Sequence, residues 1–212
     1  MLQPILKSLN SKRIVLASSS PRRKTLLQNI GLKFEVIPSN FEENLKKDTF
    51  SSPLAYVNET AKQKMLDVVH RLYKQDSPPD LIIGADTIVT MENEIFEKPA
   101  SREHAVQILS RLSGRSHRVF TSVVLATPSE ADPGYALVQF HAETEVNMGD
   151  LAPEIIQAYV DTGEPMDKAG GYGIQALGCN LISGINGDYF NVIGFPLHQF
   201  SKELLKLFPI SG

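Results

Sequence analysis

The chain has 212 residues, of which 42% are hydrophobic, so it is long enough to bury a core and is not a disordered polymer. Its 21 Lys and Arg residues against 24 Asp and Glu residues give a formal net charge of −3. That balance argues against a general nucleic-acid or anionic-membrane surface, but it permits a locally basic pocket. A single cysteine, Cys179, excludes an intrachain disulfide, and no stretch approaches the roughly 18 apolar residues of a membrane span. Because the first residues also lack the apolar run of a secretory signal, we expect a cytoplasmic, reducing location.

Apolar periodicity and turn residues predict a mixed α/β order. The run 14–17 stops at three serines and a proline, which indicates a buried strand leading into a helix capped by Ser20. Ser52 and Pro53 begin a longer helix, since apolar residues then recur at spacings of three and four. In chain order, we expect strands over 14–17, 33–38, 80–90, 94–97, 116–126 and 135–148, and helices over 20–30, 52–72, 101–114, 153–162 and 196–208.

The C-terminal third carries the strongest hairpin signal in the chain. Asn186-Gly187 separates two apolar runs, so we predict that 180–185 pairs with 189–193. Residues 163–178 follow neither the helical nor the strand period, and their mixture of glycines with charged residues is typical of a binding loop. No repeat or linker divides the sequence, and we expect one domain over 1–212, although the meander over 116–148 could belong to a second lobe.

Two arginines at the start of the first predicted helix indicate an anion site. Arg22 and Arg23 stand where the helix dipole disfavours cations unless an anion binds there. Free backbone N–H groups, the guanidinium groups and the hydroxyls of Ser18, Ser19 and Ser20 would together form a phosphate cradle. The competing interpretation is a solvated basic helix start with a serine cap.

Asp86 follows an apolar run that predicts a buried strand, and a buried charge is costly unless it is paired or bound to a metal. Its carboxylate could bind a hard divalent cation or take a proton from an attacking water, or it could simply cap a turn. Lys64 and Lys98, each unremarkable alone, would neutralise a triphosphate if they converged on it. The loop over 163–178 adds five polar side chains, those of Glu164, Asp167, Lys168, Tyr172 and Gln175.

Several common catalytic patterns are missing. The five histidines are scattered without metal-ligand spacing, which argues against a zinc site. Cys179 has no histidine near it in the sequence, so we predict a small core residue rather than a nucleophile. No Walker-type glycine loop or GxGxxG motif is present.

Six motifs, in order from near residue 14 to near residue 197, closely resemble the Maf family. They are Leu16-Ala-Ser-Ser-Ser-Pro-Arg-Arg23, Glu59-Thr-Ala-Lys-Gln-Lys64, Gly84-Ala-Asp-Thr-Ile-Val89, Glu97-Lys-Pro99, Gly163-Glu-Pro-Met-Asp-Lys-Ala-Gly170 and Ile185-Asn-Gly-Asp-Tyr189. The chain also resembles the Maf-like half of a vertebrate protein in which that half is fused to a methyltransferase-like region. The resemblance implies an α/β fold with a mixed, elongated sheet flanked by helices, two lobes and a central cleft. It also implies hydrolysis of a nucleoside triphosphate between its α- and β-phosphates.

Carried over by motif, the resemblance implies specific roles. Asp86 would accept the proton, and the triphosphate and metal site would be lined by Ser18, Arg23, Glu43, Lys64 and Lys98. The acidic motif over 41–44 is looser than the others, so Glu42 could replace Glu43. Arg22, Thr87 and Gln175 match three specificity positions of the branch that acts on dTTP and UTP rather than on 7-methyl-GTP. Cys179 stands where glycine is commoner, and a homodimer is an expectation at the level of the family.

The resulting hypothesis is a metal-dependent pyrophosphatase. Mg²⁺ or Mn²⁺, held by Glu43, Asp86 and phosphate oxygens, would present the triphosphate while Asp86 activates the attacking water. The charge of the leaving pyrophosphate would be offset by the metal with Arg23, Lys64 and Lys98, and Lys168 would be a further substrate-binding residue. The alternative is a regulator of cell division that holds the nucleotide without cutting it. The carboxylates argue against that alternative, because without a metal they would repel an anionic ligand. A nucleic-acid-binding protein is disfavoured by the net charge.

Overall fold

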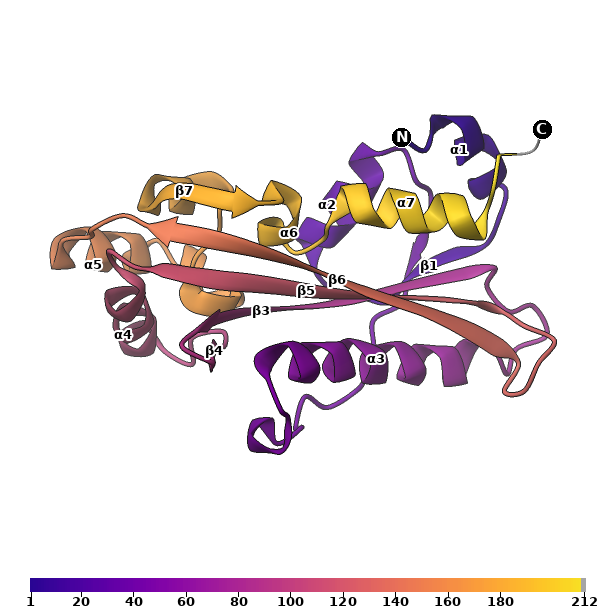
Figure 1. Ribbon diagram of the computed structural model, residues 1–212, viewed down its shortest axis with the longest axis horizontal. Coiled ribbons are helices and arrows are strands. Elements are labelled where there is room, and N and C mark those ends of the chain that lie inside the picture. The colour runs from indigo at the N-terminus through magenta and orange to yellow at the C-terminus, as the bar shows by residue number, and fades with distance from the viewer. Residues whose placement is uncertain (211–212) are drawn as a thin grey trace.

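The computed structural model describes residues 1–210, which contain a seven-stranded mixed sheet with helices on both faces (Figure 1). The last two residues of the predicted domain over 1–212 lie outside the described part. The strand order is β2-β1-β3-β5-β6-β7, with β4 paired to β3. Only the β1–β2 and β1–β3 pairs are parallel among the described strands. The strands are β1 (Ile14–Leu16), β2 (Glu35–Val36), β3 (Leu81–Met91), β4 (Glu94–Phe96), β5 (Ser116–Pro128), β6 (Tyr135–Met148) and β7 (Ile182–Gly187).

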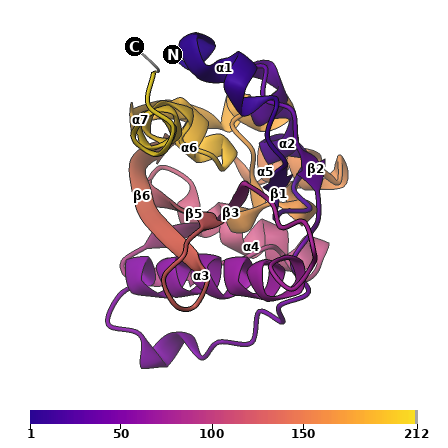
Figure 2. The ribbon, with the colours of Figure 1, turned by 90° about the vertical axis from the view of Figure 1, so that its right-hand side faces the viewer.

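The helices cover both faces of this sheet (Figure 2). One face packs on α3, and the opposite face packs on α1, α2 and α7, while α4 and α5 pack together at the far end of the long strands. Within residues 1–210, no helix is long and apolar enough to cross a bilayer. The helices are α1 (Gln3–Leu9), α2 (Pro21–Asn29), α3 (Pro53–Leu72), α4 (Arg102–Leu112), α5 (Pro153–Asp161), α6 (Tyr189–Ile193) and α7 (Leu197–Leu207). The short 3₁₀ helices are η1 (Lys47–Thr49), η2 (Glu164–Asp167), η3 (Ala169–Gly171) and η4 (Ala176–Leu181).

Serine side chains cap three helices, the predicted cap at Ser20 among them, and all three lie where the sequence predicts a helix to begin. The side chains of Ser20, Ser52 and Ser101 accept hydrogen bonds from backbone N–H groups three residues later, at 3.4, 3.1 and 3.2 Å. Each such cap stabilises its helix by about 1 kcal/mol. The cap of α2 matters most for the site, because it fixes where the two arginines of the first turn leave the helix.

The predicted hairpin over 180–193 is wrong. β7 pairs antiparallel with β6, and residues 189–193 form the helix α6 instead of a strand. Asp188 is the reason, since its side chain accepts a hydrogen bond from the backbone N–H of Phe190 at 2.8 Å and so caps a helix. Asn191 then inserts against the sheet, where its Nδ2 donates to a carbonyl of β5 at 3.0 Å.

Two smaller predictions also need correction. The strand expected over 33–38 shrinks to Glu35–Val36, because its neighbour β1 offers only three residues for pairing. Cys179 was expected in the core but is exposed. It lies in η4, where Gly178 and Leu181 are the residues that turn inward.

The cleft of this fold begins at an interruption in the sheet. Along one edge of β3, residues 81–83 pair with β1 and residues 89–91 pair with β4. The other edge is covered by β5 from 82 to 90. In the described chain, residues 84–88 therefore lack a strand neighbour on one side, and Asp86 and Thr87 lie at the centre of this gap.

Candidate active site

A cleft of about 840 Å³ opens at the gap in β3, a size that accommodates a nucleotide. Its walls come from segments far apart in the sequence: the β1–α2 turn, α3, β3, the residues after β4, and the loop between α5 and β7. Every side chain that the sequence assigns to the site lines this cleft, namely those of Ser18, Arg22, Arg23, Glu43, Lys64, Asp86, Thr87, Lys98, Lys168 and Gln175.

Asp86 is buried, with 8% of its surface exposed, and it is paired with a lysine. Its Oδ1 lies 2.8 Å from Nζ of Lys64 on α3, and the same ammonium lies 2.8 Å from Oε1 of Glu43. Lys64 thus joins two carboxylates, and the ion pair offsets part of the cost of burying Asp86. Both candidate glutamates are exposed, but Glu43 lines the cleft and Glu42 does not.

Arg23 carries a charge that no carboxylate balances directly among the described residues. Its three donating nitrogens meet neutral oxygens: Nε donates to the carbonyl of Gly194 (2.9 Å), Nη1 to Oγ of Ser18 (3.1 Å) and Nη2 to Oγ1 of Thr87 (2.9 Å). Burial lowers the pKa of the Arg23 guanidinium, and the charge of Asp86 partly opposes that change. A guanidinium held rigidly by neutral partners in a polar cleft is suited to bind an incoming anion.

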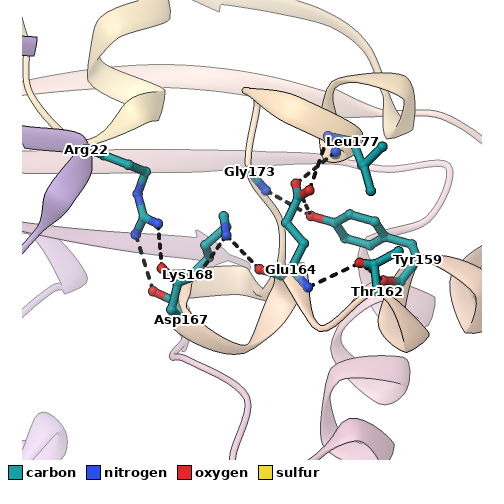
Figure 3. Close-up of polar contacts among 9 residues, drawn as sticks. Arg22, Tyr159, Thr162, Glu164, Asp167, Lys168, Gly173 and Leu177 are labelled. Carbon is teal, nitrogen blue, oxygen red and sulfur yellow. Dashed lines mark hydrogen bonds and ion pairs between the residues drawn. The ribbon is translucent and has the colours of Figure 1, made fainter. Parts of the chain in front are cut away.

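Arg22 differs from its neighbour because the protein supplies its anion (Figure 3). Oδ2 of Asp167 lies 2.8 Å from Nη1 of Arg22, and Oδ1 of the same carboxylate lies 2.6 Å from Nζ of Lys168. Burial raises the pKa of Asp167, but the hydrogen bonds from Lys168 and Arg22 outweigh burial, so the pKa lies below its ordinary value. The anion expected at the start of α2 is therefore, for Arg22, the carboxylate of Asp167. This ion pair connects α2 to the loop over 163–178.

Thr121 lies directly behind the site and supports Thr87, a role that the sequence did not reveal. It is fully buried on β5, opposite Thr87 in the register, and the two hydroxyl oxygens lie 2.9 Å apart. Thr121 donates to the carbonyl of Asn191 at 3.2 Å, and Thr87 also lies 3.4 Å from the carbonyl of Gly194. Thr87 accepts a hydrogen bond from Arg23, and either hydroxyl of the Thr87–Thr121 pair can be the donor to the other. These internal partners fix the position of the Thr87 hydroxyl at the wall of the cleft.

A buried histidine lies behind the wall of the cleft. Nε2 of His117 is 2.6 Å from the hydroxyl of Tyr172, and both residues are at most 5% exposed. Burial lowers the pKa of His117 to about 4 and raises the pKa of Tyr172. The pair is therefore neutral at pH 7, and it attaches the middle of the 163–178 loop to β5.

Comparison with known proteins places this site in a family. A family model described as "Maf-like protein" matches residues 13–207. The human "Probable bifunctional dTTP/UTP pyrophosphatase/methyltransferase protein" is 51% identical over 211 residues, which cover 98% of this chain and 34% of the relative. A "dTTP/UTP pyrophosphatase" of Desulforamulus reducens is 45% identical over 90% of this chain and 94% of its own length, and one of Schizosaccharomyces pombe is 40% identical over 92% and 84%. The chain thus spans about a third of the human relative and most of the other two. With its motifs, its sheet and its cleft in agreement with this match, the chain belongs to the Maf-like protein family.

Proposed function

We propose that this chain hydrolyses dTTP and UTP between the α- and β-phosphates, releasing the nucleoside monophosphate and pyrophosphate. The observation that carries the proposal is the buried Asp86–Lys64 pair in a cleft that also presents Arg23 without a carboxylate partner in the described chain. The names of the relatives, dTTP/UTP pyrophosphatases from a bacterium and a yeast among them, support the substrate class.

The side chains divide the work by charge. Arg23, Lys98 and Lys168 bind the triphosphate, with Ser18 as a neutral hydrogen-bonding partner. Asp86 takes the proton from the attacking water, and Lys64 keeps that carboxylate oriented from 2.8 Å away. Displacement at phosphorus needs positioning and charge stabilisation rather than a covalent nucleophile, so the exposed Cys179 has no role in it.

A divalent cation, Mg²⁺ or Mn²⁺, fits the pair of Glu43 and Asp86. The two carboxylates share the ammonium of Lys64, so both face one small region of the cleft. Nowhere in residues 1–210 do three His, Cys, Asp or Glu side chains gather into a ready-made metal site. Glu43 and Asp86 would hold the cation together with phosphate oxygens of the substrate, as is usual for Mg²⁺ in phosphate chemistry. When bound, the cation would neutralise the phosphates and polarise the bond that breaks.

Recognition of the base falls to Arg22, Thr87 and Gln175. The Gln175 amide offers one kind of donor and one acceptor, which match the neighbouring N3–H and carbonyl groups of uracil and thymine. Thr87 adds a hydroxyl group that Arg23 and Thr121 hold in place.

The test is pyrophosphate release from dTTP, UTP, CTP, GTP and 7-methyl-GTP with Mg²⁺ or Mn²⁺ and, separately, with a chelator. We expect turnover of dTTP and UTP that the chelator abolishes. Turnover confined to 7-methyl-GTP would contradict the assignment of the base-binding residues. Tight binding of dTTP without any turnover would favour the nucleotide-binding regulator.

A further inference from the structure

The turn that carries Gln175 closes on itself at its base. The backbones of Gly173 and Gly178 approach so closely that a Cβ on Gly178 would lie 2.3 Å from the carbonyl oxygen of Gly173. Between them, Ala176 has φ +53°, a left-handed conformation that is uncommon for a residue with a side chain. Gln175 is exposed at the tip of this loop and lines the cleft. The position of its amide therefore depends on what holds the loop, which we define as residues 173–178.

One carboxylate holds the end of this loop (Figure 3). Oε1 of Glu164 accepts hydrogen bonds from the N–H of Gly178 and from the hydroxyl of Tyr159, each at 3.0 Å. Oε2 of Glu164 accepts from the N–H of Leu177 at 3.2 Å. At the start of the loop, the N–H of Gly173 donates to the Tyr159 hydroxyl at 3.3 Å. Both ends of the loop are thus attached to the Glu164–Tyr159 pair.

The chemistry of these contacts assigns Glu164 to the loop rather than to the phosphates. Its carboxylate receives bonds from backbone N–H groups and a hydroxyl, while Lys168 donates to its main-chain carbonyl at 2.6 Å. A carboxylate can accept all three side-chain bonds at once, because it has only acceptor positions. An amide in its place would turn an NH₂ group toward one of the donors and lose at least one bond.

We propose that Glu164 is a positioning residue for base recognition: by fixing the 173–178 loop, it directs the amide of Gln175 toward the edge of uracil or thymine. The inference rests on the proposed function, which places Gln175 at the base. It predicts that a substitution of Glu164 weakens the recognition of the base and leaves the recognition of the phosphates unchanged.

The experiment measures recognition of the base separately from recognition of the phosphates. The KM for UTP and the inhibition constant of inorganic triphosphate, which has no base, are measured for the wild type, Glu164→Gln and Gln175→Ala. Glu154→Gln, an exposed change on the same α5–loop segment, is the matched control. Both loop variants should raise the KM for UTP about tenfold, the loss of about one hydrogen bond, and change the triphosphate constant less than about twofold. Tyr159→Phe should act in the same direction more weakly, and it replaces Glu164→Gln if thermal unfolding shows that variant to be misfolded.

The outcomes are distinct. A normal KM in Glu164→Gln beside a raised KM in Gln175→Ala overturns the inference and leaves the proposed function standing. An equal loss of triphosphate inhibition means that the whole site has collapsed, which also overturns it. If Gln175→Ala leaves the KM unchanged, then Gln175 does not read the base and Glu164 cannot act through it. If the wild type does not hydrolyse UTP, the proposed function fails, and UTP affinities of the same variants decide the inference.

Discussion

Replacing Asp86 by Asn tests the proton acceptor with little change in shape. The Asn oxygen can still accept the hydrogen bond that Lys64 Nζ donates to Asp86 at 2.8 Å, so the geometry should survive while the basic carboxylate is lost. General-base catalysis contributes about 10²–10⁴-fold, so turnover of UTP should fall by at least about 10²-fold. Nucleotide affinity should change much less, because the substitution leaves the proposed triphosphate-binding cations, Arg23, Lys98 and Lys168, in place.

The cost in stability can be worked from the same contacts. Breaking a buried ion pair costs about 3–5 kcal/mol when the remaining charge has no other partner. Here Lys64 retains Glu43 at 2.8 Å, a partner whose side chain is 55% exposed. We therefore expect Asp86→Asn to lower the free energy of unfolding by only about 1–2 kcal/mol. The variant should be folded at 25 °C, so its lost turnover will not reflect lost protein.

Three measurements decide this prediction: pyrophosphate release, UTP affinity by calorimetry, and urea unfolding. The exposed Asp76→Asn serves as the matched control. Turnover in Asp86→Asn within about tenfold of the wild type would refute the proton-acceptor role. Turnover that returns when the metal concentration is raised would leave Asp86 with the metal-binding role alone.

Three further predictions concern Arg23 in the cleft and two buried residues behind its wall, Thr121 and His117. Thr121→Val should raise the KM for UTP about tenfold and Thr121→Ser should not, because only the valine lacks the hydroxyl beneath Thr87. Equal KM values in the two variants would refute the view that Thr121 positions Thr87. Arg23→Lys keeps the charge but not the three fixed donors, so kcat/KM should fall at least about tenfold, and wild-type values would show that charge alone suffices. When the pH falls from 7 to 5, His117 is protonated in the unfolded chain but stays neutral in the folded chain, because burial lowers its pKa in the folded state to about 4. The fall in pH therefore lowers the free energy of unfolding. Measured by urea unfolding, the free energy of unfolding should fall between pH 7 and pH 5 by about 2 kcal/mol more in the wild type than in His117→Gln. Equal decreases in the two proteins would contradict this prediction.

Helix starts were predictable from the sequence because their causes are local. A serine followed by a proline or a charged residue carries its own cap, and Ser20, Ser52 and Ser101 all act where the sequence places them. The hairpin at Asn186-Gly187 failed for the opposite reason. A turn signal cannot show that a strand prefers a distant partner, and β7 pairs with β6, some forty residues earlier in the chain.

The same distinction separates the parts of the site. The residues carried by motifs all line the cleft, because each motif holds a strand end, a helix start or a loop that the fold brings to the gap in β3. Thr121 and the loop contacts of Glu164 escaped prediction, since their meaning depends on register and on closure of a loop. Thr121 is one of several polar residues of β5, and only the pairing of β5 with β3 sets it opposite Thr87. Buried polar residues in otherwise apolar strands were the available signal.

The charges of the cleft explain why a metal should be needed. Five cationic side chains line it, those of Arg22, Arg23, Lys64, Lys98 and Lys168, but so do five carboxylates, those of Glu43, Asp86, Glu97, Glu164 and Asp167. The cleft therefore brings no net positive charge to a triphosphate that carries roughly four negative charges, and like charges at close range are costly in a partly buried site. A divalent cation bound with the phosphates would reduce that charge and would give Glu43 and Asp86 a favourable partner. Arg23 alone cannot neutralise the negative charge of the triphosphate. The chelator should therefore abolish turnover, although every cationic side chain of the protein remains in place.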